Sequence, residues 1–289
     1  MTTTPGKKFR DAVWSERPLQ IAGTINAYTA LLAQKAGFKA IYLSGSGVAA
    51  ASYGLPDLGY TLLENVAEDA KRITGAVDLP LLVDVDTGWD DAGDTVRLME
   101  NIGVAAIQIE DQIDAKRCGH RPNKQLVTKE EMGARVKAAV SARKDKDFVV
   151  MARCDALASE GLDGFLARSR YYIECGADMI FAEAMTDITH YEKIKKSLKV
   201  PLLANLTEFG KTDLYTADQL KSVGVDMALY PLSAFRAMSR AAEEIYNTIR
   251  EDGTQRAVVK SMQTREELYD VLDYYKYERE ADEAFKDKK

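Results

Sequence analysis

The sequence predicts a closed barrel of eight parallel β-strands surrounded by helices, the (β/α)8 or TIM barrel. Short apolar runs alternate with longer stretches of helical periodicity, a pattern typical of βα units on a parallel sheet. Glycine follows several predicted helices, as in Ile102-Gly103 and Val223-Gly224, where it can adopt the left-handed conformation that ends a helix. The first apolar run is not followed by the GxGxxG motif of an open dinucleotide-binding sheet.

Eight strands are predicted, in order, from the apolar runs. They cover residues 19–22, 40–44, 81–84, 106–110, 148–153, 179–183, 202–205 and 227–230. The helices follow from apolar residues spaced three and four apart. They cover residues 8–15, 27–36, 62–74, 91–102, 129–143, 161–175, 188–198 and 216–223.

Beyond the eighth strand, two amphipathic segments are predicted at residues 232–252 and 265–277, although one helix suffices to close the barrel. The surplus contains tyrosines at positions 269, 274, 275 and 277. Tyrosine is common both in helices that cover a barrel and in helices that dock on another subunit, so both remain open. Residues 276–289 alternate in charge, as in a solvated helix. We expect one barrel domain over residues 1–289 with a helical extension from about residue 232.

Composition disfavours several classes of function. The 39 Lys and Arg residues against 45 Asp and Glu give a net charge of −6, which offers no general attraction to nucleic acid or to an anionic membrane. No apolar stretch reaches the ~18 residues of a membrane span. The three widely spaced cysteines do not resemble a disulfide framework, and the N-terminus lacks a signal-peptide pattern. We therefore expect a cytoplasmic protein without nucleic-acid or membrane partners.

The segment Lys116-Arg117-Cys118-Gly119-His120 carries the best candidate for the chemical step. Two cations and an imidazole flank the thiol of Cys118, so its pKa should be lower than that of a free cysteine. Such a thiol could give or take a proton near neutral pH. The alternative is a structural cysteine in a basic loop. The surrounding residues 111–128 are polar and aperiodic, as in a lid beside a barrel mouth.

Nearly every predicted strand ends in a polar or charged residue, at the end of the barrel where active sites of this fold lie. The candidates are Ser44, Gly45, Ser46, Asp84, Asp86, Glu110, Asp111, Arg153, Asp155, Glu183, Asn205, Thr207 and Arg236. A structural barrel would need none of these groups, so the cluster indicates an enzyme.

The charges of this cluster predict its ligands. Asp57, Asp84, Asp86 and Glu110 would repel one another unless a cation lay among them, which indicates Mg²⁺ or Mn²⁺ held directly or through water. The alternative for Asp84 and Asp86 is a solvated acidic turn. The predicted ligand is a small polycarboxylate that also chelates the metal, because guanidinium groups bind carboxylates bidentately. The candidate guanidinium groups are those of Arg153, Arg236 and Arg265.

The segment KRCGH at 116–120, with Glu110-Asp111-Gln112 before it and Arg121-Pro122-Asn123-Lys124 after it, resembles the active-site loop of the isocitrate lyase and phosphoenolpyruvate mutase superfamily. The similarity covers nearly the whole chain. Its further motifs are YLSG at 42–45, DVDTG at 84–88, NLTEFG at 205–210, PLSAFR at 231–236 and QTREELY at 263–269. The loop cysteine is missing from the phosphonate-forming branch, so the resemblance favours the carbon-carbon lyases.

The resemblance implies that Asp84 and Asp86 hold Mg²⁺, with Asp57 and Glu110 in its water shell. It implies substrate contacts from Ser44, Gly45, Ser46, Cys118, Gly119, Arg153, Glu183, Asn205, Leu206, Thr207, Arg236 and Arg265. The implied reaction cleaves 2-methylisocitrate, a small tricarboxylate of propionate degradation, to pyruvate and succinate. The family's subunits exchange their last helix in a homotetramer, which would account for the surplus C-terminal helices.

In the mechanism we expect, Cys118 gives a proton to the succinate carbanion. His120 and Glu183 set hydrogen bonds around that thiol, Arg153 holds a substrate carboxylate, and Tyr42 is a possible helper of the base.

Several alternatives remain open from the sequence. The substrate could instead be isocitrate or oxaloacetate. Phe181 and Leu229 either wall a pocket for one methyl group or belong to the barrel core. A Schiff-base aldolase is disfavoured because no predicted strand ends in lysine, and a non-catalytic carboxylate-binding barrel is the third competitor.

Overall fold

The computed structural model describes residues 3–113 and 124–286 of the chain. The chain divides into two compact units, residues 1–235 and residues 236–289. Within the described ranges, no helix is both long enough and apolar enough to cross a membrane.

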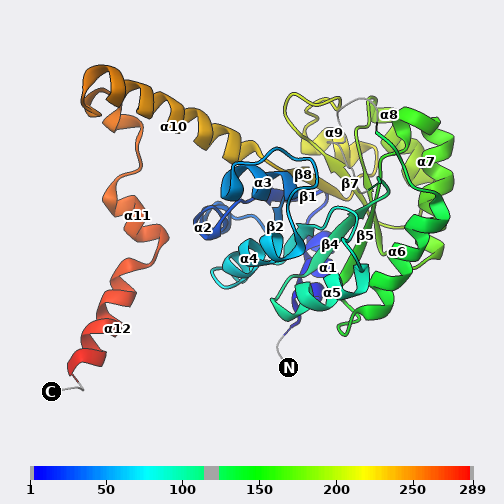
Figure 1. Ribbon diagram of the computed structural model, residues 1–289, viewed down its shortest axis with the longest axis horizontal. Coiled ribbons are helices and arrows are strands. Elements are labelled where there is room, and N and C mark those ends of the chain that lie inside the picture. Colours follow the sequence, from blue (N-terminus) through cyan, green and yellow to red (C-terminus); the bar gives the residue numbers. More distant parts are fainter. Residues whose placement is uncertain (1–2, 114–123, 287–289) are drawn as a thin grey trace. The chain divides into compact units, whose positions relative to one another are not determined.

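The first unit is built on eight parallel strands that close into a barrel in chain order, with β8 paired to β1 (Figure 1). The strands are β1 (Leu19–Gly23), β2 (Ala40–Leu43), β3 (Leu81–Asp84), β4 (Ala106–Glu110), β5 (Val149–Cys154), β6 (Met179–Ala182), β7 (Leu202–Asn205) and β8 (Met227–Tyr230). The predicted (β/α)8 barrel is therefore confirmed.

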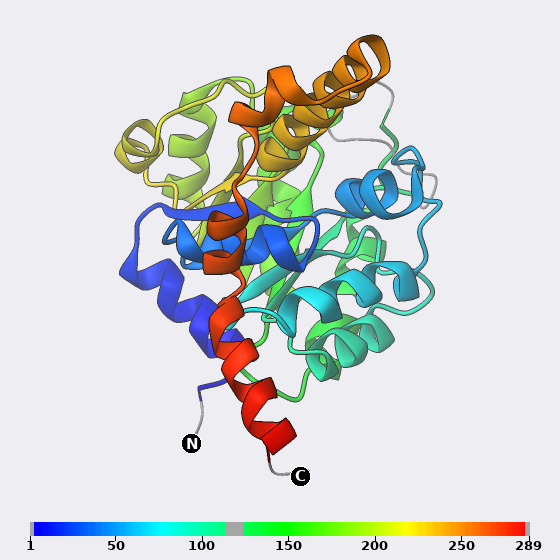
Figure 2. The same ribbon diagram turned by 90° about the vertical axis from the view of Figure 1, so that its left-hand side faces the viewer.

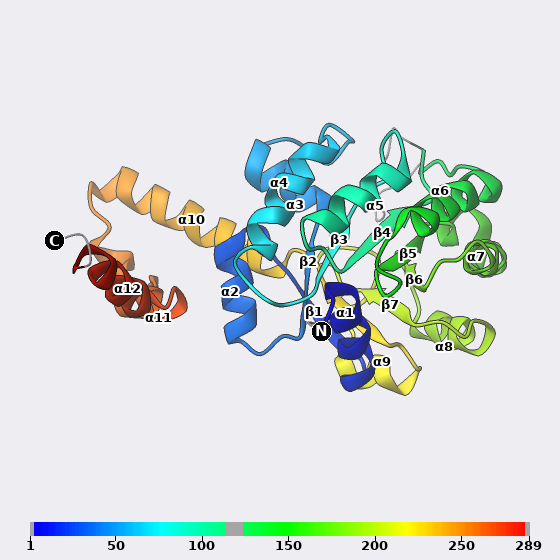
Figure 3. The same ribbon diagram turned by 90° about the horizontal axis from the view of Figure 1, so that it is seen from below.

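Helices follow the strands on the outside of the barrel (Figure 3). They are α2 (Ala27–Lys35), α3 (Gly45–Tyr53), α4 (Leu63–Thr74), α5 (Ala92–Asn101), α6 (Lys129–Ala142), α7 (Leu157–Glu174), α8 (Ile188–Ser197) and α9 (Ala217–Ser222). Most begin after a polar residue whose side chain accepts a hydrogen bond from a free backbone N–H of the first turn. Thr128 does so for α6 and Asp187 for α8.

Helix α1 (Pro5–Ser15) precedes the barrel and closes its amino end. Thr4 caps the helix, and Pro5 fits its first turn because that position needs no N–H donor. Phe9, Ala12 and Val13 of α1 pack into the cluster of side chains that fills the barrel interior. The functional groups therefore have only the opposite end of the barrel available.

The strand alternation sorts side chains into an inner and an outer core. On β5, Val149 and Met151 belong to the inner cluster, whereas Val150, Ala152 and Cys154 pack outward against the helices. Because neighbouring residues of a strand point to opposite faces, the residue after Ala152 points inward again. The same alternation points the polar side chains at the ends of the other strands toward the mouth of the barrel.

Helix α3 was not predicted. Ser44 was predicted to end the second strand, with Gly45 and Ser46 after it, but Ser44 is the N-cap of α3 and its hydroxyl accepts a hydrogen bond from the Gly47 N–H at 3.3 Å. Glycine and serine are poor helix formers, so the sequence signal was weak. Burial of Val48 and Ala49 stabilises the helix instead.

Helix α10 (Ser233–Asp252) leads into the second unit, which continues through η1 (Arg256–Ser261), α11 (Arg265–Val271) and α12 (Tyr274–Lys286), drawn in orange and red in Figure 2. The single helix predicted over 265–277 is wrong, because Asp273 adopts a left-handed backbone conformation (φ 49°) that separates α11 from α12. All residues of α10, η1 and α11 are described, and none is buried.

Candidate active site

A layer of buried polar side chains lies at the carboxyl end of the barrel. All five are buried: Asp84, Glu110 and Asn205 end β3, β4 and β7, Arg153 is the last residue but one of β5, and Glu183 directly follows β6. Each stands two or four residues beyond an inward-facing apolar residue of the same strand. The period of two therefore places them above the apolar filling of the barrel, as predicted from the strand ends.

The carboxylates of Asp84 and Asp86 converge on Gly45, the first residue of α3. A Cβ atom at Gly45 would lie 3.1 Å from Asp86 Oδ1 and 3.3 Å from Asp84 Oδ2. Asp86 has a left-handed backbone (φ 48°), a conformation rare for residues other than glycine and often found at functional sites. The loop after β3 thus holds two carboxylates beside one space.

Three donors fix Asp84. The N–H of Asp86 donates to Oδ1 at 3.2 Å, the N–H of Gly45 donates to Oδ2 at 3.1 Å, and the amide of Gln108 also donates to Oδ1. The Gly45 N–H therefore serves Asp84, and a contact of Gly45 with substrate stays a prediction. Gln108 was missed by the sequence reasoning, although it stands two residues before Glu110 and so points into the barrel.

The donor set fits a hard divalent cation. In the part of the chain that is described, no three His, Cys, Asp or Glu residues form a metal-binding group. Asp84 and Asp86 can supply two carboxylate ligands, and water would complete the shell, as Mg²⁺ prefers. The buried Oε1 of Gln108 has no hydrogen-bond partner among the described residues and can accept from such a water. Asp57 is half-buried in the connection between α3 and α4.

Arg153 lies among three carboxylates. Its Nε and NH2 groups donate to Asp155 at 2.9 and 3.3 Å, whereas Glu110 lies at 3.4 Å and Glu183 at 3.6 Å. Burial alone would lower the pKa of the guanidinium, but these carboxylates raise it well above the ordinary value. Arg153 is therefore a permanent cation whose position is set by ion pairs, and its charge is also 5.4 Å from the ring centre of Phe181.

Glu183 and Asn205 form a second pair in this layer. The Asn205 amide donates to Glu183 at 3.1 Å, and its Oδ1 has no hydrogen-bond partner among the described residues. Thr207 is half-buried nearby in sequence. The side chain of Leu206 packs in the outer core, so any substrate contact of this residue would come from its backbone.

Tyr42, Phe181 and Leu229 belong to the inner cluster of the barrel. Burial raises the pKa of Tyr42 well above its ordinary value, and the charge of Asp84 raises it further. A neutral phenol donates hydrogen bonds, whereas a base would need the phenolate, so the position of Tyr42 favours a donor. Phe181 and Leu229 form part of the apolar floor beneath the polar layer.

The residues Cys118, Gly119 and His120 lie outside the described residues, as do Lys116 and Arg117. The chain around residues 114–123 is described at both ends. There Gln112 and Leu126 form an antiparallel bridge, and Ile113 N–H donates to the Gln125 carbonyl at 3.1 Å. Arg236 and Arg265 belong to the second unit, and their contacts with substrate remain predictions.

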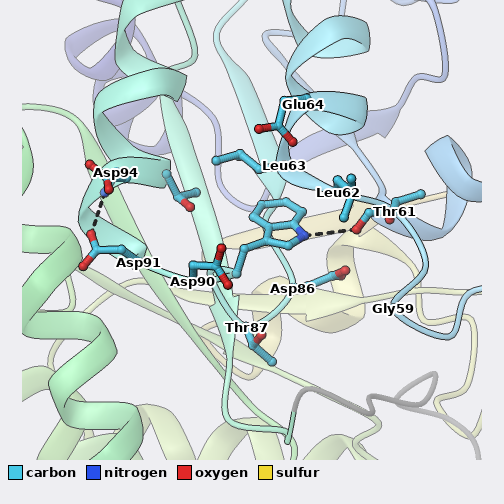
Figure 4. Close-up of a pocket in the computed structure, with 12 residues that line it drawn as sticks. Gly59, Thr61, Leu62, Leu63, Glu64, Asp86, Thr87, Asp90, Asp91 and Asp94 are labelled. Carbon is cyan, nitrogen blue, oxygen red and sulfur yellow. Dashed lines mark hydrogen bonds between the residues drawn. The ribbon is translucent and has the colours of Figure 1, made fainter.

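A cavity of about 440 Å³ adjoins this site (Figure 4). Asp86 and Thr87 line it together with Glu64, Asp90 and Asp94. Its rim is therefore acidic, which suits water and cations better than a carboxylate ligand.

A (β/α)8 barrel with buried carboxylates and an ion-paired arginine at the carboxyl ends of its strands has the architecture of an enzyme. The model of the phosphoenolpyruvate phosphomutase family matches residues 9–250, and the chain belongs to this family. The predicted resemblance to the superfamily is thereby confirmed.

The curated relatives make the class of reaction specific. The chain is 56% identical to 2-methylisocitrate lyase of Escherichia coli (strain K12) over 98% of this chain and 97% of that protein. It is 46% identical to 2-methylisocitrate lyase of Bacillus subtilis (strain 168), over 94% of this chain and 90% of that protein. The chain is therefore an enzyme of the lyase class.

Solved structures agree on the fold. A 2,3-dimethylmalate lyase superposes with a TM-score of 0.90 at 31% identity, covering 98% of this chain and 96% of that chain. A phosphonopyruvate hydrolase in complex with oxalate and Mg²⁺ superposes with a TM-score of 0.82 at 30% identity, covering 96% and 97%.

Proposed function

We propose that this chain is a Mg²⁺-dependent lyase that cleaves 2-methylisocitrate to pyruvate and succinate. Relatives of that name are 53 to 56% identical to it over nearly its whole length. The structural observation that carries the proposal is that the Asp84–Asp86 pair and the buried cation Arg153 belong to one polar layer at the barrel mouth. A tricarboxylate substrate needs both a chelated metal and a cation for a further carboxylate.

In this proposal Asp84 and Asp86 hold Mg²⁺ directly, with Asp57 and Glu110 through water. Bound Mg²⁺ would supply a Lewis acid that polarises the substrate hydroxyl and its neighbouring carboxylate. A solved relative that contains Mg²⁺ with oxalate supports a divalent metal in this family. Mn²⁺ shares the preference for oxygen ligands and could replace it.

The chain's own residues then act on the carbon skeleton. A base removes the hydroxyl proton, the carbon-carbon bond breaks, and its electron pair moves to the succinate carbon as pyruvate forms its carbonyl. The guanidinium of Arg153 stabilises the charge that spreads into the adjacent carboxylate. Asn205, with a buried acceptor oxygen, orients the substrate's hydroxyl or a bound water.

We infer that Cys118 delivers the proton that completes succinate, with His120 and Glu183 around its thiol. The other two cysteines are buried, and burial raises the pKa of Cys154 well above its ordinary value, with a further rise from the charge of Asp111. Neither is therefore a good alternative proton donor.

The test of substrate is the release of pyruvate from 2-methylisocitrate, of glyoxylate from isocitrate and of oxalate from oxaloacetate, measured under matched conditions. A pocket that distinguishes one methyl group is worth about 1 to 3 kcal/mol, so kcat/KM should favour 2-methylisocitrate by roughly 10-fold or more. An equal or higher value with isocitrate or oxaloacetate would assign the chain to one of those substrates instead.

For the acid, Cys118→Ser should lose about 100-fold or more in kcat while the fold is kept, because a hydroxyl is a far weaker acid than a thiol. Retention of kcat within a factor of about three would remove Cys118 from the chemical step.

For the metal, Mg²⁺ should raise the unfolding temperature of the wild-type chain but not that of Asp84→Ala, because a ligand that binds only the folded state stabilises it. Chelation should abolish turnover, and added Mg²⁺ should restore it. A full thermal response of Asp84→Ala to Mg²⁺ would exclude Asp84 as a ligand.

The proposal includes assembly as a homotetramer with exchanged C-terminal helices and a location in the cytoplasm. The assembly rests on the resemblance to the superfamily, whereas the location and the treatment of residues 1–289 as one barrel domain with a helical extension rest on the sequence.

A further inference from the structure

Asp155 joins several elements behind the polar layer. Its carboxylate accepts two hydrogen bonds from Arg153, from Nε at 2.9 Å and from NH2 at 3.3 Å. It also accepts one from Lys124 Nζ at 2.9 Å and one from Gln112 Nε2 at 3.4 Å. Its N–H donates to Asp111 at 2.9 Å. Asp155 is thus the shared partner of two cations that lie 29 residues apart in the sequence.

Lys124 is unusual because its charge is buried. Its side chain is 5% exposed and that of Asp155 is fully buried. A lysine normally keeps its ammonium group in water, and it gives up hydration only where a charged partner replaces it. The Lys124–Asp155 pair is therefore a buried ion pair and not a surface salt bridge.

The geometry connects Lys124 to the guanidinium. Lys124 donates a hydrogen bond to Oδ1 of Asp155, and the same carboxylate accepts hydrogen bonds from Nε and NH2 of Arg153. Glu110 and Glu183 are farther away, at 3.4 and 3.6 Å, so they restrain Arg153 less. If Asp155 turned, Arg153 would follow it or shift toward the other two carboxylates.

Position in the chain gives this contact a second consequence. Lys124 lies six residues after Cys118 in the sequence, and the Gln112–Leu126 bridge joins the chain on either side of that segment. The same lysine therefore ties the returning chain to the strand end that bears Arg153.

We propose that Lys124 is a positioning residue, which fixes the Asp155 carboxylate and through it orients the Arg153 guanidinium toward a substrate carboxylate. The inference rests on the proposed function, in which Arg153 receives that carboxylate. Lys124 itself touches no reacting atom.

The experiment compares Lys124→Met with the wild-type chain in kcat/KM for 2-methylisocitrate and in the dissociation constant for succinate with Mg²⁺ present. We expect kcat/KM to fall about 10-fold or more and succinate to bind more weakly, because a small misplacement of a charged group is costly to catalysis. Lys137→Met, on the exposed face of α6, is the matched control and should behave as wild type.

A merely structural role is separated by three readouts. Lys124→Arg should recover part of the lost kcat/KM, and added ethylammonium should partly restore the kcat/KM of Lys124→Ala. In an Asp155→Asn background, Lys124→Met should lower kcat/KM by no more than about threefold further, because the two residues act through one contact. If Lys124→Met does not fold, Lys124→Arg and the Asp155→Asn double variant carry the same comparison.

The inference is overturned if Lys124→Met keeps kcat/KM and succinate affinity within about twofold of wild type. It is also overturned if the losses in kcat/KM caused by Lys124→Met and by Asp155→Asn multiply in the double variant. A wild-type chain inactive with all three candidate substrates would overturn the proposed function instead. Succinate affinity would then still decide the role of Lys124.

Discussion

Gly45 shows how one missing methyl group can define a site. It begins α3, and its Cα faces the space between Asp84 and Asp86. A side chain there would meet carboxylate oxygens at 3.1 and 3.3 Å, closer than most Cβ contacts in proteins. The neighbouring carboxylates, and not the helix, therefore require glycine at position 45.

Gly45→Ala should weaken Mg²⁺ binding by about 10-fold or more while leaving the fold intact, since Ala is favoured over Gly in a helix by about 1 kcal/mol. Isothermal titration with Mg²⁺ and thermal unfolding measure the two effects. Unchanged Mg²⁺ affinity would contradict the assignment of this space to the metal.

Gly23→Ala is the contrasting variant. A Cβ at Gly23 would lie 1.8 Å from the Pro231 carbonyl, so backbone would have to move near the joined edges of β1 and β8. We expect this change to damage the fold itself, which distinguishes it from the loss at Gly45.

At the residue scale, the sequence was informative where chemistry and strand position coincide. Asp84, Glu110 and Arg153 could be predicted because each ends an apolar run. The role of Gln108 could be inferred only from its alternation with Glu110, and the pairing of Lys124 with Asp155 depends on tertiary contacts. Local pattern does not encode such long-range pairs.

At the scale of elements, α7 is secured by its own side chains. Arg168 donates two hydrogen bonds to Glu160 at 2.8 and 2.6 Å, and one to the Val127 carbonyl at 2.9 Å. These bonds span the interruption of the helix at Gly161 and join α7 to the chain before α6. The helix therefore also supports the returning end of the segment that begins after Ile113.

The pairing lowers the pKa of Glu160, chiefly through the hydrogen bonds from Arg168, which outweigh its burial. A carboxyl with a lowered folded pKa stabilises the fold above its unfolded pKa, about 4.3, and loses that contribution as the pH falls through the folded value. Glu160→Gln should therefore cost up to about 1 kcal/mol at pH 7, since the pair is partly exposed, and progressively less below about pH 4.3.

Urea unfolding of Glu160→Gln and wild type between pH 7 and the lowest pH at which both fold measures this difference. Glu174→Gln, exposed at the end of the same helix, is the control. A difference that stays constant across this range would show that the charge of Glu160 contributes nothing.

Strand positions were predicted well because a short apolar run between two helical stretches leaves little freedom for a strand of four to six residues. Helix α3 and the break at Asp273 were missed for opposite reasons. The first is a helix of weak local preference stabilised by packing, and the second interrupts a segment of strong helical periodicity with a single backbone conformation.

At the scale of the whole molecule, the described part of the C-terminal unit carries exposed apolar side chains. Tyr275, Tyr277 and Phe285 are 54, 65 and 68% exposed, and α10, fully described, has no buried residue. Exposed apolar surface of this extent is typical of an interface. A second copy of the chain is the partner that the resemblance to the superfamily implies.

Sedimentation equilibrium should give a particle mass of about four chains, as the predicted homotetramer requires. Deletion of residues 265–289 should lower that mass, because it removes the aromatic side chains of α11 and α12. Lys137→Met should sediment as the full chain does. A monomer at micromolar concentration would contradict the predicted assembly.

Phe9 and Val13 of α1 belong to the cluster of side chains that fills the barrel, so no channel leads to its amino end. A ligand can therefore enter and leave only at the carboxyl ends of the strands. In the proposed function, pyruvate and succinate would share this one exit, and product-inhibition patterns measured against 2-methylisocitrate show whether one must leave before the other.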